Sequence, residues 1–298
     1  MTRPCKVGVQ LPEVERFVPW PEYLDLARRA EGAGFDSIWV GDHLLYDLPD
    51  GSTRGPYEAW TTLAAIAAVT ERVEIGPLVA STSFHAPAML AKQASTVAAI
   101  SQGRLIVGLG AGWNRREYDA FGFPYDRRVS RFEEALAIIV ALLREGRTTF
   151  HGQYYDVDNC VLDPGPVRPG GPPIMLGSNS PRMLSIGLPV VDSWNVWWSV
   201  YDNTVDRFAE MKAEVDAVMP AGRHVEATAA VLVTLPGSEG RLMGDTYGAT
   251  VATVRPGDVG DHVRGLANAG ATHLQLVLDP ITADAIDTIG EALADLES

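Results

Sequence analysis

The chain has 298 residues, of which 46 % are hydrophobic and 21 % are charged, and its formal net charge is −14. This length suits one large α/β domain or two ordinary ones, and the composition is that of a globular protein with a sizeable core. The acidic balance argues against nucleic acid or an anionic membrane as a partner.

Cysteines are few, and no apolar run is long. Cys5 and Cys160 are too far apart in sequence to predict a disulfide framework or a zinc site. No apolar stretch reaches the length of a membrane span, and the first residues lack the apolar segment of a signal peptide. We therefore expect a cytoplasmic protein with reduced thiols.

Short apolar runs alternate with amphipathic segments along the whole chain. The predicted strands are 7–11, 35–40, 73–79, a fourth within 103–114, 174–176, 190–196, 226–235 and 273–278. The predicted helices are 20–33, 57–69, 87–100, 129–143, a short one from 181, 203–218, 256–269 and 281–296. Eight strands in alternation with about eight helices favour a single (β/α)₈ barrel, a TIM barrel, over residues 1–298.

Two segments stand apart from this alternation. Residues 147–162 carry aromatic and β-branched residues around a His-Gly turn, which predicts a β-hairpin inserted after the fourth helix. A glycine-rich segment near 241–248 follows the seventh strand. No linker divides the chain, so we expect one domain.

The fourth strand ends in alternating glycines, within the run G-R-L-I-V-G-L-G-A-G-W-N at 103–114. Gly108, Gly110 and Gly112 let the backbone come close to a ligand after the apolar run 105–107, although they could also simply relieve crowding there. The spacing is not G-x-G-x-x-G, and no acidic ribose partner follows, so a Rossmann site is a poor interpretation.

Two further strand ends carry polar groups. Asp42 and His43 follow the second strand, where a histidine can exchange a proton near neutral pH or can merely pack locally. Residues 177–180, G-S-N-S, precede Pro181 and offer hydroxyls and backbone N–H groups to a phosphate. The same residues would also make an ordinary Ser N-cap with Pro at the first helical position.

Aromatic and basic residues gather near the same strand ends. Some of the aromatic residues must belong to the core, but their number predicts a pocket for a flat and largely apolar ligand. The set is Tyr46, Tyr57, Trp60, Trp113, Trp194, Trp197 and Trp198. The basic set is Arg115, Arg116, Arg127, Arg128 and Arg131. These arginines form either a rim for an anionic cofactor or a solvated face paired with Glu117, Asp119, Asp126, Glu133 and Glu134.

The strand ends lack the residues that several enzyme classes require. Paired carboxylates are scarce, which argues against a glycosidase, and no lysine is placed for Schiff-base chemistry. Only His43, Asp42 and Asp279 could serve as metal ligands there, so we expect no metal.

Taken together, the motifs are similar to those of a known family. They are S-I-W-V-G-D-H at 37–43, I-G-P-L-V-A-S at 75–81, H-A-P-A-M-L-A-K-Q-A-S-T-V at 85–97, the glycine run at 103–114, F-H-G-Q-Y-Y at 150–155 and P-P-I-M-L-G-S at 172–178. On these residues the chain resembles the luciferase-like monooxygenase superfamily, and within it the oxidoreductases that depend on coenzyme F420, a deazaflavin. The resemblance extends over nearly the whole chain and implies the same (β/α)₈ barrel.

The resemblance also implies a site at the mouth of the barrel. Asp42 and His43 match the pair typical of deazaflavin members, where the histidine donates or accepts the proton that accompanies hydride transfer. The implied cofactor-binding residues are Leu78, Val79, Ala80, Ser81, Gly110, Gly112, Trp113, Asn114, Gly177, Ser178 and Asn179, with a non-prolyl cis peptide bond at Leu78–Val79. Leu11, Tyr46 and Trp113 would border the substrate.

The implied activity is hydride transfer between F420 and a small, partly apolar organic substrate by a homodimer. An alternative within the superfamily is an FMN-dependent monooxygenase that uses O₂ and reduced flavin supplied by a separate reductase. A third possibility is a cofactor-binding protein without turnover. This chain also departs from its relatives, because Trp113 stands where some deazaflavin members carry an acid and Ser178 stands where many relatives have glycine.

Overall fold

A parallel sheet of nine strands forms the centre of the computed structural model, which describes residues 3–48, 50–238 and 251–296. The order of the strands is β5-β2-β1-β13-β12-β11-β10-β7-β6. They are β1 (Lys6–Gln10), β2 (Ser37–Val40), β5 (Glu74–Pro77), β6 (Ala80–Ser81), β7 (Val107–Gly110), β10 (Ile174–Gly177), β11 (Ser193–Val196), β12 (Glu226–Thr234) and β13 (Ala271–Asp279).

The sheet closes on itself. Its two outermost strands, β5 and β6, are consecutive in the chain and are separated only by Leu78 and Val79, whose peptide bond is cis. β6 pairs with β7, and Ile75 of β5 forms a parallel bridge to Leu105, just before β7. β5 and β6 therefore share one position, and the sheet is the predicted eight-position TIM barrel.

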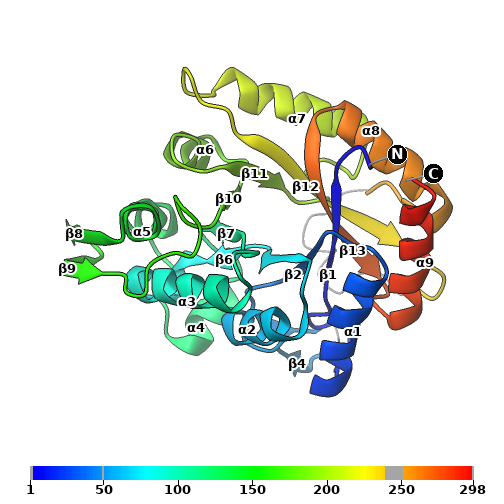
Figure 1. Ribbon diagram of the computed structural model, residues 1–298, viewed down its shortest axis with the longest axis horizontal. Coiled ribbons are helices and arrows are strands. Elements are labelled where there is room, and N and C mark those ends of the chain that lie inside the picture. Colours follow the sequence, from blue (N-terminus) through cyan, green and yellow to red (C-terminus); the bar gives the residue numbers. More distant parts are fainter. Residues whose placement is uncertain (1–2, 49, 239–250, 297–298) are drawn as a thin grey trace.

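Helices cover the outside of the barrel (Figure 1). They are α1 (Trp20–Gly32), α2 (Ala59–Val69), α3 (Pro87–Ile100), α4 (Arg115–Phe121), α5 (Arg128–Glu145), α6 (Pro181–Gly187), α7 (Val205–Ala217), α8 (Val259–Asn268) and α9 (Ala283–Ala294), with short 3₁₀ turns η1 (Thr82–Phe84) and η3 (Pro256–Asp258). Their apolar faces pack on the outward side chains of the strands and form one continuous core. None of the described helices is both long enough and apolar enough to cross a bilayer.

The predicted hairpin insertion is present after α5. Strands β8 (Arg147–His151) and β9 (Asp156–Val161) pair antiparallel and are separate from the barrel sheet. Glu134 of α5 holds the turn, because its carboxylate accepts hydrogen bonds from three successive backbone N–H groups of residues 153–155. The predicted glycine-rich segment near 241–248 lies outside the described residues.

The fourth strand ends later in the sequence than predicted. β7 runs to Gly110, so Gly108 and Gly110 belong to the strand and do not follow it. Val107 and Leu109 point outward into the core, whereas Gly108 and Gly110, which alternate with them, face the inside of the barrel. Two small elements were not predicted: the pair β3 (Tyr46–Asp47) and β4 (Thr53–Arg54), and the helix α4.

Candidate active site

A cavity of about 410 Å³ lies at the carboxyl ends of the barrel strands. It is lined by segments that follow β1, β2, β5, β7, β10 and β11, together with the first turn of α5. Among the residues predicted to form the site, those that line it are Asp42, His43, Tyr46, Leu78, Val79, Ser81, Gly110, Gly112, Trp113, Gly177, Ser178 and Asn179. Residues from four distant stretches of sequence are thus brought together.

Three predicted residues do not line this cavity, and in each case the local geometry explains why. Leu11 is fully buried in the core, because it shares the outward face of Val7 and Val9. Ala80 points away from the cavity because it lies between Val79 and Ser81 in an extended segment. The side chain of Asn114 is engaged elsewhere: it caps α4 and donates to the carbonyl of Leu45 at 3.0 Å.

The floor of the cavity is built around Val79. A Cβ added at Gly108, Gly110 or Gly177 would lie 2.9, 2.9 and 2.5 Å from the methyl groups of Val79. A side chain at any of these three positions would therefore force Val79 to shift, because real Cβ atoms do not approach so closely. The expectation that the glycines open the backbone to a ligand is corrected in this detail: Val79 occupies the space, and its side chain is what the floor offers to the cavity.

Asp42 is part of the wall between the second and third strand ends. Its Oδ2 accepts hydrogen bonds from the backbone N–H of Ser81 at 2.8 Å and from His85 Nε2 at 2.9 Å. The carboxylate thereby fixes the segment after the cis bond. Asp42 forms no hydrogen bond to its neighbour His43; its histidine partner is His85.

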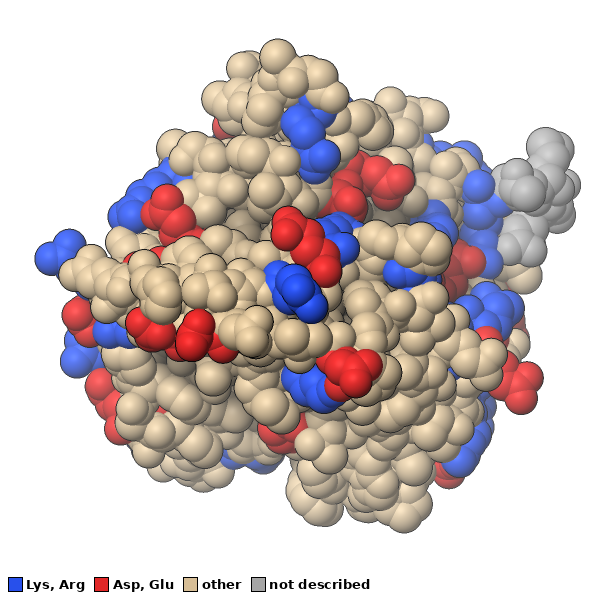
Figure 2. Space-filling view, turned by 60° about the vertical axis from the view of Figure 1, so that its left-hand side comes forward, with Lys and Arg blue, Asp and Glu red and all other residues tan. Residues whose placement is uncertain are grey.

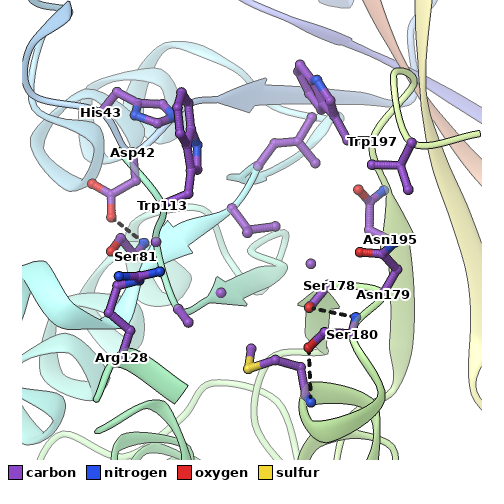
Figure 3. A pocket seen from close by; sticks show the side chains of 18 of the residues that line it. Asp42, His43, Ser81, Trp113, Arg128, Ser178, Asn179, Ser180, Asn195 and Trp197 are labelled. Carbon is purple, nitrogen blue, oxygen red and sulfur yellow. Dashed lines mark hydrogen bonds between the residues drawn. The ribbon is translucent and has the colours of Figure 1, made fainter. Parts of the chain in front are cut away.

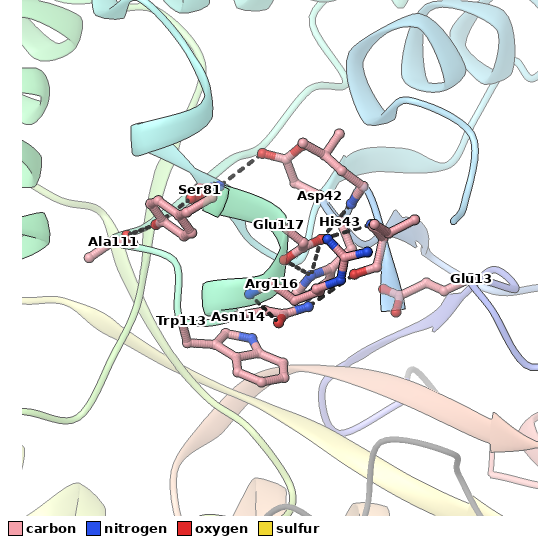
Figure 4. Close-up of polar contacts among 12 residues, drawn as sticks. Glu13, Asp42, His43, Ser81, Ala111, Trp113, Asn114, Arg116 and Glu117 are labelled. Atoms are coloured by element: carbon pink, nitrogen blue, oxygen red, sulfur yellow. Dashed lines mark hydrogen bonds and ion pairs between the residues drawn. The ribbon is translucent and has the colours of Figure 1, made fainter. Parts of the chain in front are cut away.

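His43 has a different acidic partner, Glu117 of α4 (Figure 4). Both carboxylate oxygens lie 3.1 Å from Nδ1 of the histidine. The side chain of Glu117 is 1 % exposed, and that of His43 is 19 % exposed at the edge of the cavity. The ring of His43 also contacts Tyr46 and Trp113, with centroid distances of 4.8 and 5.8 Å.

The electrostatics of His43 follow from these contacts. Burial alone would lower its pKa, because the charged imidazolium loses hydration. The hydrogen bond to Glu117 and the nearby charges of Glu13, Glu117 and Asp42 act in the opposite direction. The acidic neighbours prevail, and the pKa of His43 is raised above its ordinary value.

Two buried carboxylates near His43 were missed as site residues. Glu117 was treated as one of several acids that could neutralise surface arginines, whereas it is fully buried. Glu13 lines the cavity, accepts a hydrogen bond of 2.6 Å from Gln10 Nε2, and lies so close over Gly41 that a Cβ there would force the carboxylate to move. Glu117 follows Trp113 by four residues, one helical turn, which is the only signal the sequence offered.

The opposite side of the cavity is richer in neutral polar groups. Figure 3 shows Trp197 and Asn195 across from His43 and Trp113, with the turn 178–180 below Asn195 and Arg128 on the side of Trp113 and Ser81. Ser180 caps α6 through the N–H of Met183, with Pro181 at the first helical position, so the predicted N-cap is confirmed. Ser178 and Asn179 line the cavity beside it.

The arginine cluster divides between the two roles considered for it. Arg115 pairs with Asp119 at 3.1 Å and Arg116 with Asp47 at 3.0 Å, both on the surface. Arg128 instead lines the cavity, with its guanidinium 3.7 Å from the centroid of the Tyr125 ring. Elsewhere acidic and basic side chains intermix, as Figure 2 shows for one face of the molecule.

The aromatic residues divide between the cavity and the core, as the sequence predicted. Tyr46, Trp113, Trp197 and Trp198 line the cavity. Trp60 and Trp194 are buried in the core, and Tyr57 packs beside Trp20 on the surface of α1. Trp113 is 41 % exposed, which leaves part of its ring surface accessible at the cavity.

Solved structures share this fold over nearly the whole chain. An F420-dependent secondary alcohol dehydrogenase in complex with an F420–acetone adduct has a TM-score of 0.78 at 20 % identity, covering 99 % of both chains. The oxygenating constituent of 3,6-diketocamphane monooxygenase from Pseudomonas putida, in complex with FMN, has a TM-score of 0.74 at 17 % identity, covering 98 % of both. At these identities the likeness concerns the fold alone.

Curated relatives match about half of the chain. An uncharacterised protein of Mycobacterium tuberculosis is 30 % identical over 176 residues, which cover 54 % of this chain and 60 % of the relative. The phthiodiolone/phenolphthiodiolone dimycocerosates ketoreductase of the same species is 31 % identical over 179 residues, which cover 54 % of this chain and 47 % of the relative. The match therefore spans about half the length of these relatives.

A family model matches a larger part of the sequence. The luciferase-like monooxygenase model covers residues 6–236, from the first barrel strand to the end of β12. This region contains the predicted site residues from Asp42 to Asn179 and both newly found carboxylates. The chain belongs to the luciferase-like monooxygenase family.

Proposed function

We propose that this protein is an oxidoreductase that moves a hydride between coenzyme F420 and a small, partly apolar organic substrate, with His43 as the proton donor or acceptor. The observation that carries the proposal is the setting of His43. Its Nδ1 is engaged by a buried carboxylate while its ring lines the cavity. A histidine in this setting can exchange a proton with a substrate oxygen near neutral pH.

The residues around the cavity suit a flavin-like group. Val79 and Leu78 give the floor an apolar surface, and Trp113 and Trp197 supply flat walls on opposite sides. Ser178, Asn179 and Arg128 provide hydroxyl, amide and guanidinium donors around the cavity, the chemistry that an anionic side chain requires. When bound, F420 supplies hydride transfer without oxygen chemistry.

The direction of proton transfer at His43 depends on the oxidation state of the substrate. If a carbonyl is reduced, its carbon gains the hydride and its oxygen takes a proton from the imidazolium of His43. If an alcohol is oxidised, the neutral imidazole accepts the hydroxyl proton as the hydride leaves the carbon. The named activities of a ketoreductase and of a secondary alcohol dehydrogenase among the similar proteins support a carbonyl or alcohol group as the reacting centre.

Binding and turnover test the proposal together. Purified protein is titrated separately with F420 and with FMN while cofactor fluorescence is followed, and then assayed without oxygen on secondary alcohols and ketones of increasing size. We expect saturable F420 binding and a change in deazaflavin absorbance on adding substrate. Tight FMN binding without F420 binding would contradict the choice of cofactor.

An FMN-dependent monooxygenase is the second proposal, because a monooxygenase solved in complex with FMN shares the fold with a TM-score of 0.74. It predicts oxygen consumption when reduced FMN is supplied, and it requires a separate reductase. A cofactor-binding protein without turnover would bind F420 or FMN and leave every substrate unchanged. We propose a homodimer in each case, to be tested by light scattering.

A further inference from the structure

We propose that Glu117 is a positioning residue for His43: it keeps the proton of the neutral ring on Nδ1, so that Nε2 is the nitrogen that exchanges a proton with the substrate. This inference rests on the proposed function, because it concerns the same proton transfer. It assigns to a residue of α4 a role that its place in sequence, among surface arginines, does not suggest.

The contact with Glu117 determines whether Nδ1 of His43 donates or accepts a hydrogen bond. An ionised carboxylate can only accept hydrogen bonds, so the contact of 3.1 Å requires Nδ1 to donate. The same carboxylate also accepts from the backbone N–H groups of Leu44 at 2.5 Å and Leu45 at 3.2 Å. Three donors, Nδ1 and two backbone N–H groups, thus converge on this buried carboxylate.

Nε2 of His43 has no competing hydrogen-bond partner among the described residues. No residue in the described part of the chain forms a hydrogen bond to it, and the ring lines the cavity. Because the bond at one ring nitrogen determines the tautomer of the other, a neutral His43 presents the lone pair of Nε2 as the basic site. In the charged ring, the proton on Nε2 is the one available to a substrate.

Helix α4 and the segment after β2 are held together by hydrogen bonds in both directions. Asn114 caps α4 and donates to the carbonyl of Leu45, while Glu117 accepts from the N–H of the same residue. The contact with the ring of Tyr46 limits rotation of His43 from another side. The carboxylate and the imidazole therefore keep their relative orientation.

Other charged groups face the histidine and must be separated from Glu117 in any test. Glu13, from the segment after β1, and Asp42, its chain neighbour, both favour the charged ring. Asp42 is engaged by His85 and Ser81, and neither Asp42 nor Glu13 is hydrogen-bonded to His43 in the structure. Among the described residues, Glu117 is the one whose carboxylate is hydrogen-bonded to a ring nitrogen of His43.

The direct test is ¹⁵N NMR of histidine-labelled protein, wild type and Glu117→Gln, with His43→Gln used to assign the signal. It requires neither cofactor nor substrate. In the wild type we expect Nδ1 to stay protonated and Nε2 to titrate. In Glu117→Gln the amide can donate to Nδ1, so we expect the neutral ring to shift toward the Nε2–H tautomer and its pKa to fall.

A matched control excludes a general effect of removing a buried carboxylate. Glu134→Gln also removes a carboxylate that accepts three backbone N–H groups, but it lies at the hairpin, away from His43. We expect its His43 signals to be unchanged. Unchanged tautomer and pKa in Glu117→Gln would overturn the inference.

Kinetics provide the second readout. We expect kcat/KM of Glu117→Gln to fall by about 100-fold with KM little changed, as for loss of a general base. In alcohol oxidation, the rise of kcat/KM with pH should move to lower pH, because the pKa of His43 falls. Glu117→Asp should restore part of the rate, and Glu134→Gln should stay within about twofold of wild type.

The two proposals fail in distinguishable ways. If wild type shows no hydride transfer with F420, the proposed function fails while the NMR result still reports on Glu117. If wild type is active but Glu117→Gln keeps its rate, its pH profile and its tautomer, the proposed function stands and the role of Glu117 is refuted.

Discussion

Two histidines at opposite ends of the barrel, one buried and one half-buried, have opposite charge preferences. His43, at the carboxyl ends of the strands, contacts a carboxylate, and its pKa is raised. His273, at the amino end of β13, lies 2.7 Å from the hydroxyl of Ser37, and burial lowers its pKa to about 3. The neighbourhood, not the residue type, decides the charge.

The physical difference is the presence of a counter-charge. Burial penalises the charged ring at both sites, and it prevails at His273, where the nearby Lys6 adds to the effect. At His43 the carboxylates of Glu117 and Glu13 outweigh it. The barrel thus separates a histidine that stays neutral from one that can change charge at the cavity.

The largest effect is expected when the cavity histidine is removed. His43→Gln keeps a polar side chain but cannot titrate, so kcat/KM for hydride transfer should fall by about 10²- to 10⁴-fold. Steady-state assays with F420 would measure this, with cofactor binding by fluorescence as the control. Full turnover in this variant would refute the proton role of His43 but would leave the fold intact.

Removing the partner of the other histidine should affect stability instead. The hydroxyl of Ser37 contacts His273 Nε2 and accepts the indole N–H of Trp39 at 2.7 Å. Ser37→Ala leaves buried polar groups without this partner, which should cost about 1–3 kcal/mol of unfolding free energy. Denaturant unfolding at neutral pH measures the change. A loss of activity without loss of stability would contradict the assignment of a structural role to His273 and a catalytic role to His43.

Acid should destabilise the protein through His273. Its pKa is lowered in the folded state, so the unfolded chain binds more protons between pH 6.5 and about 3, and stability falls as pH falls through this window. From pH 7 to 5 this group should remove roughly 2 kcal/mol. We expect the variant His273→Gln to lack this part of the stability loss between pH 7 and 5. An identical pH dependence in the variant and wild type would contradict a neutral His273.

The smallest effect is expected for the pH dependence of stability through His43, which has the opposite sign to that through His273. Because the pKa of His43 is raised by folding, its contribution to stability is complete below the unfolded pKa and is lost as pH rises through the folded pKa. Unfolding curves between pH 6 and 9 should therefore decline less in His43→Gln than in wild type. A steeper decline in the variant would reverse the sign assigned to His43.

Local patterns predicted most of the elements. The periodicity of 129–143 corresponds to α5, which ends at Gly146 with φ of 77°, and the hairpin 147–162 corresponds to β8 and β9. Helix α4 was missed because its sequence, R-R-E-Y-D-A-F, has charges that hide a short buried face. Glu117 and Tyr118 are both fully buried there.

The sequence by itself determined the alternation of strands and helices, the family, and the segments at the strand ends, because these depend on short-range periodicity and motifs. Only the tertiary structure decided which groups meet. His43 and Glu117 are 74 positions apart, and Val79 lies against glycines of β7 and β10. Such contacts depend on closure of the barrel, so no local pattern distinguishes a buried carboxylate from its solvated neighbours.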